Sequence, residues 1–347
     1  MLVGHGRCQP RSLFIGLGIA LPFALLIALL SGPVFISPID LPAIVFGSGS
    51  SLREQDFLIL SSIRLPRLLL GCFIGINLAV CGAAMQGLFR NPLADPSLIG
   101  VTSGASAGAS CVIVLGGGWL ESAAAGLPLV ALGASVGGLI AVVIVYRIAT
   151  SPSGTAVATM LLAGIAISAV AGALNNLFSY FADNDMLRRI SLWQMGSLDG
   201  ANWYRVAIAF VVACVLIAVL PRWSAGLNAL LLGESEARHL GIDVERLKRR
   251  LIVLTAIGVG SAVALAGVIA FVGLVIPHVL RLLVGPDHRY VIPGSALAGG
   301  ILLLLADSLA RVIVAPAELP TGILTALLGA PVFFSLLWQQ RRLSSLS

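Results

Sequence analysis

The sequence has very little charge and almost no lysine. Only 10% of its 347 residues are Asp, Glu, Lys or Arg, against about a quarter in soluble domains, and Lys248 is the one lysine. The low charge excludes an ordinary soluble domain. A phosphate-binding P-loop is excluded as well, because no Gly-x-x-x-x-Gly-Lys precedes Lys248. We therefore predict a chain that is no enzyme and binds no cofactor, so that any ATP and Mg²⁺ belong to a partner subunit.

Other reactive motifs are also lacking. The sequence has no His-Glu-x-x-His, Gly-x-Ser-x-Gly or Cys-x-x-Cys, and its 5 cysteines fall mostly inside apolar runs without metal-ligand spacing. We predict no metal site. The net charge of +6 comes from basic residues spread over many loops, which favours contact with anionic lipid over binding to nucleic acid.

Apolar residues, by contrast, make up 58% of the chain and form runs of the length that an α-helix needs to cross about 30 Å of hydrocarbon. We predict an all-α polytopic membrane protein, one domain over residues 1–347, with about ten transmembrane helices. The first is interpreted as a retained span because no small-residue cleavage site follows before Pro33. The continuous run 250–284 is divided at Ala266-Gly267. The predicted spans lie near 13–30, 66–88, 97–115, 127–146, 156–180, 203–220, 250–266, 268–284, 291–314 and 320–338.

Basic residues set the orientation, because they accumulate in short cytoplasmic loops. With both termini inside, fourteen of the 21 basic residues fall on the cytoplasmic side and seven on the other. The opposite orientation inverts this ratio. Both termini are therefore predicted to be cytoplasmic.

Few ionisable residues fall inside the predicted spans. A transporter driven by an ion gradient usually needs such residues to bind its coupling ion. Asp307 is the one strong acid there, close to the outer end of its span, and Arg311 follows at i, i+4, where the two side chains can neutralise each other. A secondary transporter is therefore the weaker alternative. A third alternative, a purely structural membrane protein, would leave the polar segments of the chain without a shared function.

One long hydrophilic stretch, about residues 221–250, separates two spans. Within it, residues 234–240 can form a short amphipathic helix that breaks at Gly241, ahead of the basic cluster 246–250. We interpret this stretch as a docking surface on the cytosolic face.

Several long segments, in order from about residue 60 to the C-terminus, resemble the permease family of ABC importers for ferric siderophores, haem and vitamin B12. They are Arg64-Leu-Pro-Arg67, Gln86-Gly-Leu-Phe-Arg-Asn-Pro-Leu-Ala-Asp-Pro96, Leu232-Gly-Glu-Ser-Glu-Ala-Arg-His-Leu-Gly241, Phe271-Val-Gly-Leu-Val-Ile-Pro-His-Val-Leu-Arg-Leu-Leu-Val-Gly-Pro-Asp-His288 and Ala317-Glu-Leu-Pro-Thr-Gly-Ile-Leu-Thr-Ala-Leu-Leu-Gly-Ala-Pro331. The resemblance implies a vitamin B12-importer-like permease in the bacterial inner membrane. Its implied partners are a second copy of itself, two ATPase subunits and a periplasmic substrate-binding protein.

The resemblance also implies roles for single residues. Arg64, Arg67 and Arg311 match outer-surface arginines that pair with acids of the binding protein; the alternative is that Arg64 and Arg67 anchor a helix end among lipid headgroups. The residues that match the element coupling the permease to its ATPase are Glu234, Glu236, Arg238 and Gly241. A solvated linker is the alternative there.

Asn91 and Leu93 match a cytosolic gate, although Asn91 before Pro92 is also typical of a plain turn. The family's second gate falls at 154–160, where the match is poor and no residue is assigned. Near residues 186–198 the chain is more similar to haem permeases than to the vitamin B12 version. Arg188 or Arg189 can attract the propionates of haem, or can simply cap a helix end. We expect haem as the substrate, ahead of ferric siderophores and vitamin B12.

Overall fold

The computed structural model describes residues 8–32, 51–116, 123–152, 154–315 and 317–344. Seven of its helical stretches are long and apolar enough to cross a membrane, and three shorter apolar helices bring the set to the ten that the sequence predicts. In chain order they are α1 (Pro10–Leu30), α4 (Leu65–Leu88), α5 (Val101–Leu115), α6 (Ala123–Ala149), α7 (Val157–Phe181), α9 (Trp203–Val219), α12 (Val244–Ala266), α13 (Val272–Val284), α14 (His288–Ile313) and α15 (Thr321–Ser344). The prediction of about ten helices is confirmed.

Shorter elements connect these helices. They are α3 (Ser51–Leu58), the π-helix η1 (Ile59–Arg64), the 3-10 turns η2 (Pro96–Ile99) and η4 (Leu220–Trp223), α8 (Asn184–Gln194), α10 (Ser224–Leu232), α11 (Glu234–His239) and the two-residue strands β1 (Thr150–Ser151) and β2 (Gly154–Thr155). The strands form an antiparallel hairpin in which Thr150 pairs with Thr155. Pro33, the residue before which the sequence shows no cleavage site, lies outside the described residues, as do both chain ends.

Helix α4 is the centre of the bundle. It continues from α3 and η1 without a break, and it packs against α1, α9, α12, α13 and α14. Its side chains are buried almost throughout, including Leu70, Ile74 and Met85, none of which is exposed at all. A helix that is apolar on every side is expected in such a position.

Small residues let the helices approach closely. Gly75 of α4 lies against the backbone of Gly299 in α14, and Gly108 of α5 lies against that of Gly133 in α6, so that a Cβ atom fits at neither glycine. Close backbone contact supplies the dispersion energy that holds helices together in lipid, where hydrophobicity does not. The seams α4–α14 and α5–α6 are built in this way.

The run 250–284 breaks where the sequence predicts. Helix α12 ends at Ala266, and Gly267 (φ +70°) turns the chain in a conformation that favours glycine. A side chain at Gly267 would also collide with the carbonyl of Trp193. Phe271 adopts φ +67° just before α13, so the two helices are joined by a non-helical segment inside the bundle.

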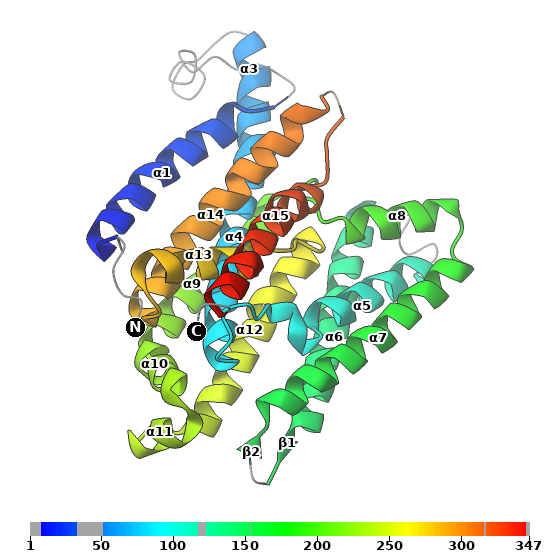
Figure 1. Cartoon of the computed structure of the whole chain (residues 1–347). Coiled ribbons are helices and arrows are strands. Elements are labelled where there is room, and N and C mark those ends of the chain that lie inside the picture. Colours follow the sequence, from blue (N-terminus) through cyan, green and yellow to red (C-terminus); the bar gives the residue numbers. More distant parts are fainter. Residues whose placement is uncertain (1–7, 33–50, 117–122, 153, 316, 345–347) are drawn as a thin grey trace.

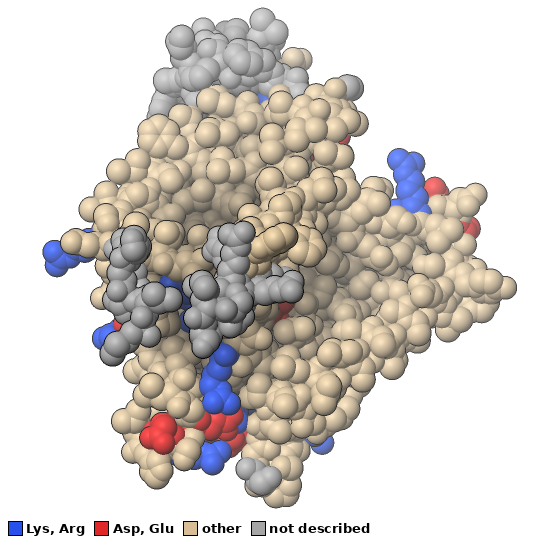
Figure 2. Space-filling view, viewed as in Figure 1, with Lys and Arg blue, Asp and Glu red and all other residues tan. Residues whose placement is uncertain are grey.

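The two ends of the bundle are named here by the elements that lie there. Figure 1 shows α11 and the β1–β2 hairpin at one end, hereafter the α11 end, and α3 at the other, the α3 end, with α8 on the upper right. Figure 2 shows acidic and basic side chains gathered at the α11 end, further charged side chains at the right, where α8 lies, and at the left edge, and a largely uncharged surface over the rest of this face. This distribution fits a bilayer around the middle of the bundle.

Candidate functional site

Helix α11 stands out at the α11 end as a short helix with polar outward side chains. Gly233 (φ +122°) precedes it, and Gly241 (φ +81°) ends it, with its N–H donating to the carbonyl of Arg238 at 2.9 Å. Ala237 is fully buried and anchors the helix. Among the predicted coupling residues, Glu236, Arg238 and Gly241 are exposed and Glu234 is half-buried. The predicted short helix with its break at Gly241 is confirmed.

Two large apolar side chains flank this helix on the surface. Leu232 is 67% exposed and Leu240 is 63% exposed. The exposed face of α11 and its ends is therefore amphipathic. The coupling role of α11 itself stays a prediction.

Lys248, the only lysine, ties this helix to the rest of the bundle. It is 2% exposed, and its Nζ donates to Glu234 Oε2 at 2.7 Å, to Glu245 Oε1 at 3.2 Å and to the carbonyl of Thr155 at 2.7 Å. A buried ammonium has three donors, and all three are used here. The lysine thereby connects α11, α12 and the β1–β2 hairpin.

The hairpin is held on α12 from a second direction. The N–H of Thr155 donates to Glu245 Oε2 at 2.8 Å, and Arg238 Nη2 approaches Glu245 Oε1 at 3.6 Å. Helix α7 begins at Val157, directly after the hairpin. Lys248 and Glu245 therefore link α11 to the hairpin that precedes α7. The sequence reasoning missed both residues, although a lone lysine with an acid at i−3 was a readable signal.

The predicted gate residues form a turn after α4. Asn91 Oδ1 accepts the N–H of Leu93 at 2.9 Å, and the carbonyl of Asn91 accepts the N–H of Ala94 at 3.1 Å. Asn91 is exposed and Leu93 half-buried. The carbonyl of Pro92 lies 3.1 Å from Nδ1 of His278 in α13. The predicted turn is confirmed, and its gating role stays a prediction.

A cavity of about 360 Å³ lies beyond this turn, between η2, α4, α5, α12 and α13. Its polar lining comes from Asp95, Ser97, Thr102 and Ser103, and Phe271 closes another side. Asp95 caps η2 by accepting the N–H of Ser97 at 2.8 Å. The sequence reasoning did not single out this polar hollow, because its walls come from segments far apart in the chain.

At the α3 end, Arg64, Arg67 and Arg311 are buried, not displayed on the surface. They are 4%, 6% and 4% exposed. Arg64 Nη1 donates to the carbonyl of Leu29 at 2.8 Å, and Arg311 Nη1 donates to that of Ser31 at 2.6 Å. These carbonyls belong to the last turn of α1 and its cap, which have no partners within the helix. The expected exposure of the three arginines is therefore wrong, because Arg64 and Arg311 satisfy the end of α1 and Arg67 is bound to a buried acidic residue.

Asp307 is the common acceptor of this cluster. Arg67 reaches it with Nε and Nη2, the shortest contact being 3.0 Å, and Arg311 Nε lies 3.0 Å from its other oxygen. Thr321 adds a hydroxyl donor at 2.9 Å, and Arg67 Nη1 also binds Glu318 Oε2 at 2.6 Å. The predicted Asp307–Arg311 pair is confirmed, but it is one part of a larger network.

Arg188 and Arg189 lie on α8, whose first turn is capped by Asp183 Oδ1 accepting the N–H of Met186 at 2.8 Å. Both arginines are exposed. Among the residues that the structure describes, no carboxylate lies within ion-pair distance of either guanidinium. The two side chains are thus open to an anionic group approaching α8.

Known proteins resemble this chain over nearly its whole length. The model of the FecCD transport family matches residues 20–339. The hemin transport system permease protein HmuU of Yersinia pestis is 43% identical over 97% of this chain and 98% of its own length. The cobalamin import system permease protein BtuC of Halobacterium salinarum is 42% identical over 88% of this chain and 81% of its own. A solved metal-chelate type ABC transporter in an inward-facing conformation superposes with a TM-score of 0.83 at 32% identity, covering 95% of this chain and all of that one.

Proposed function

The chain belongs to the FecCD transport family and is the permease subunit of an ABC importer, and from this premise we propose that it moves haem from the periplasm to the cytoplasm. The observation that carries the proposal is the 43% identity with a hemin permease over nearly both full lengths. Import would proceed by alternating access at the interface of a homodimer, driven by two ATPase subunits. A periplasmic binding protein would deliver the substrate.

The proposed coupling runs through α11. Its exposed face, with Glu236 and Arg238 between Leu232 and Leu240, would sit on the ATPase. Closure of the ATPase pair would push α11, and Lys248 would pass the displacement to the hairpin before α7. Rigid elements joined by a few strong polar contacts support a rigid-body switch of this kind. Asn91 and Leu93 would gate the cytosolic exit.

The orientation follows from the same reasoning. We assign the α11 end to the cytoplasm and the α3 end to the periplasm of a bacterial inner membrane, with both termini cytoplasmic. The excess of basic residues on the α11 side supports this assignment. Arg188 and Arg189 on α8 would then face the periplasm and attract the propionates of haem.

Docking of the binding protein would involve the cluster at the α3 end. The three arginines of this cluster, Arg64, Arg67 and Arg311, already bind groups of this chain. An acidic side chain of the binding protein therefore has to replace one of these partners. Glu318 is the partner best suited to replacement, because its side chain is 34% exposed whereas that of Asp307 is 3% exposed. We propose that an acid of the binding protein competes with Glu318 for Arg67.

An ion-gradient transporter is the weaker candidate. Asp307 is buried and its charge is already balanced within the chain, because it accepts hydrogen bonds from Arg67 and Thr321 and pairs with Arg311. A coupling ion would have to displace these partners. Ferric siderophores and vitamin B12 remain alternative substrates of an ABC importer. The 42% identity with a cobalamin permease favours the second of these alternatives.

The test is a gene deletion in an iron-starved strain that is grown on haem alone, on a ferric siderophore alone, or on neither. We expect growth on haem to be lost and to return with the wild-type gene, but not with a variant carrying Glu236→Ala and Arg238→Ala. Loss of growth on the siderophore with retained growth on haem would refute haem as the substrate and leave the importer mechanism standing.

A further inference from the structure

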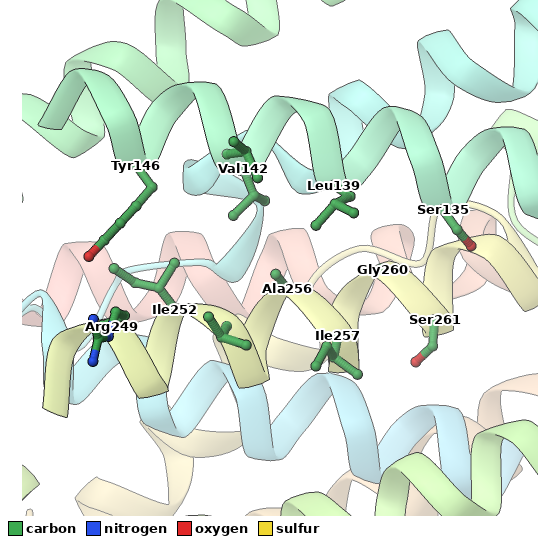
Figure 3. Close-up of a pocket in the computed structure, with 12 residues that line it drawn as sticks. Ser135, Leu139, Val142, Tyr146, Arg249, Ile252, Ala256, Ile257, Gly260 and Ser261 are labelled. Atoms are coloured by element: carbon green, nitrogen blue, oxygen red, sulfur yellow. The ribbon is translucent and has the colours of Figure 1, made fainter. Parts of the chain in front are cut away.

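An apolar groove runs along the outside of the bundle between α6 and α12. It encloses about 400 Å³ and is lined mainly by aliphatic side chains, among them Leu139, Val142, Ile252, Ala256 and Ile257. Figure 3 shows Tyr146 and Arg249 together at one end, and Ser135 and Ser261 at the other. Both serine hydroxyls donate to backbone carbonyls of their own helix. The groove is therefore apolar along its length and cationic at one end only.

The cationic end opens into a second, polar cavity of about 540 Å³. The two cavities share Tyr146 and Arg249, and the polar one continues to Thr150, Ser151 and Arg246 at the α11 end. Its acids are already engaged, since Glu245 binds Lys248 and Asp243 lies 2.9 Å from Arg246. Over the described residues, no carboxylate lies within ion-pair distance of Arg249. Its charge is available to a ligand.

The length of the groove matches one leaflet of a bilayer. Ser135 and Tyr146 are eleven positions apart on α6, and Arg249 and Ser261 are twelve positions apart on α12. At about 1.5 Å per residue, the groove is roughly 16–18 Å long. Half of a hydrocarbon core of about 30 Å is about 15 Å. Leu139, Val253 and Ile257 are 60%, 51% and 49% exposed, so the groove is open along its side.

We propose that this groove binds a phospholipid with an anionic headgroup. The phosphate would accept from the guanidinium of Arg249 and the hydroxyl of Tyr146, the rest of the headgroup would occupy the polar cavity, and one acyl chain would fill the apolar groove. Basic pockets between transmembrane helices on the cytoplasmic side suit such lipids. The proposal rests on the proposed orientation, which puts the α11 end at the cytoplasmic leaflet.

The test is native mass spectrometry of the purified full chain, delipidated in detergent and then given phosphatidylglycerol or phosphatidylcholine with identical acyl chains. We expect the wild-type chain to retain phosphatidylglycerol about fivefold better, the effect of one well-placed basic residue. Arg249→Gln should remove this preference. The matched control is Arg250→Gln, which removes the same charge from the neighbouring position, where the guanidinium lies over the ring of Trp223 at 5.8 Å.

A second variant tests the acyl-chain groove without touching charge. A Cβ atom at Gly260 would come no closer than 3.7 Å to its nearest neighbour, a methyl carbon of Val101, so a side chain can begin there, and Gly260→Leu adds apolar bulk to the wall of the groove. We expect it to lose both lipids while keeping the wild-type elution profile and melting temperature.

Three outcomes would overturn the proposal: equal retention of the two lipids by the wild-type chain, equal behaviour of the two arginine variants, or undiminished binding by Gly260→Leu. Cross-linking of two copies through a cysteine placed at Gly260 would assign the groove to a subunit contact and would overturn it as well. The measurement uses no ATPase and no haem, so a failure of the proposed transport function would leave its readout unchanged.

Discussion

Lys248 Nζ and Glu234 Oε2 lie 2.7 Å apart and join the start of α12 to the first residue of α11. The lysine is buried, whereas the helix that it holds has most of its surface exposed. This pair, together with the bond from Lys248 to the carbonyl of Thr155, joins α11 to the hairpin before α7. Such a connection can transmit a displacement of α11, outside the membrane, to α7 inside it.

Lys248→Met should separate ATP hydrolysis from transport. The methionine fills the buried space but removes the buried cation that Glu234, Glu245 and the carbonyl of Thr155 share. The connection from α11 to the hairpin is then reduced to the longer, exposed contact of Arg238 with Glu245. We expect ATP hydrolysis by the assembled importer to stay within about twofold of wild type while transport falls about tenfold, which corresponds to about 1.4 kcal/mol. Both rates are measured in the same proteoliposomes.

The matched control is Arg246→Met, which removes a cation that is 69% exposed and pairs with Asp243 on the surface. Exposed pairs contribute about 0–1 kcal/mol, so this variant should behave as wild type. Lys248→Arg should recover part of the transport. A parallel loss of hydrolysis and transport in Lys248→Met would instead assign the lysine a purely structural role.

Asp307→Asn should destabilise the fold strongly. It leaves the guanidiniums of Arg67 and Arg311 buried without their common counter-charge, and breaking a buried pair in this way costs about 3–5 kcal/mol. We expect a large drop in the melting temperature of the detergent-solubilised chain. Glu318→Gln is the comparison within the same cluster: it keeps an acceptor at a partly exposed position and should cost less than about 1 kcal/mol. Similar melting temperatures for the two variants would contradict this account of the cluster.

Gly299→Ala should disrupt the seam between α4 and α14. Its Cβ would collide with Ala79 and with the carbonyl of Gly75, and such overpacking costs about 1–3 kcal/mol. Gly172→Ala adds the same methyl group where no heavy atom lies within 4 Å. We expect it to be neutral or slightly stabilising, because alanine favours the helix. Thermal unfolding followed by size-exclusion chromatography distinguishes the two, and equal unfolding temperatures would rule out a tight seam.

Arg188→Gln combined with Arg189→Gln should slow haem uptake at low haem concentration and leave the maximal rate unchanged. Two exposed guanidiniums raise the local concentration of an anion, and salt screens this effect. We therefore expect the difference from wild type to shrink as ionic strength rises. The double variant Arg147→Gln, Arg222→Gln removes the same charge at the α11 end and should leave uptake unaltered. A salt-independent defect would place the arginines in a structural role.

The ten spans and α11 were predictable because they depend on local patterns. Apolar length predicts the spans, Gly267 predicts the break after Ala266, and Gly241 predicts the end of α11. The Asp307–Arg311 pair was predictable for the same reason, because its residues are one helical turn apart.

The burial of Arg64, Arg67 and Arg311 was not predictable from such patterns. Arg67 meets Asp307 across 240 positions of the sequence, and Arg311 satisfies carbonyls of α1 that are about 280 positions away. The sequence pattern of an arginine beside an apolar run is the same whether the side chain faces a lipid headgroup or a buried acidic residue. The role of Lys248 was missed in the same way, because two of its three acceptors lie in other elements.

Haem uptake into proteoliposomes that contain this permease, its ATPase and its binding protein tests the central claim most directly. We predict uptake that requires ATP hydrolysis inside the vesicles when the α11 end faces the lumen, and that continues when an uncoupler collapses the proton gradient. Uptake that proceeds without the ATPase and stops with the uncoupler would contradict the assignment as an ABC importer permease.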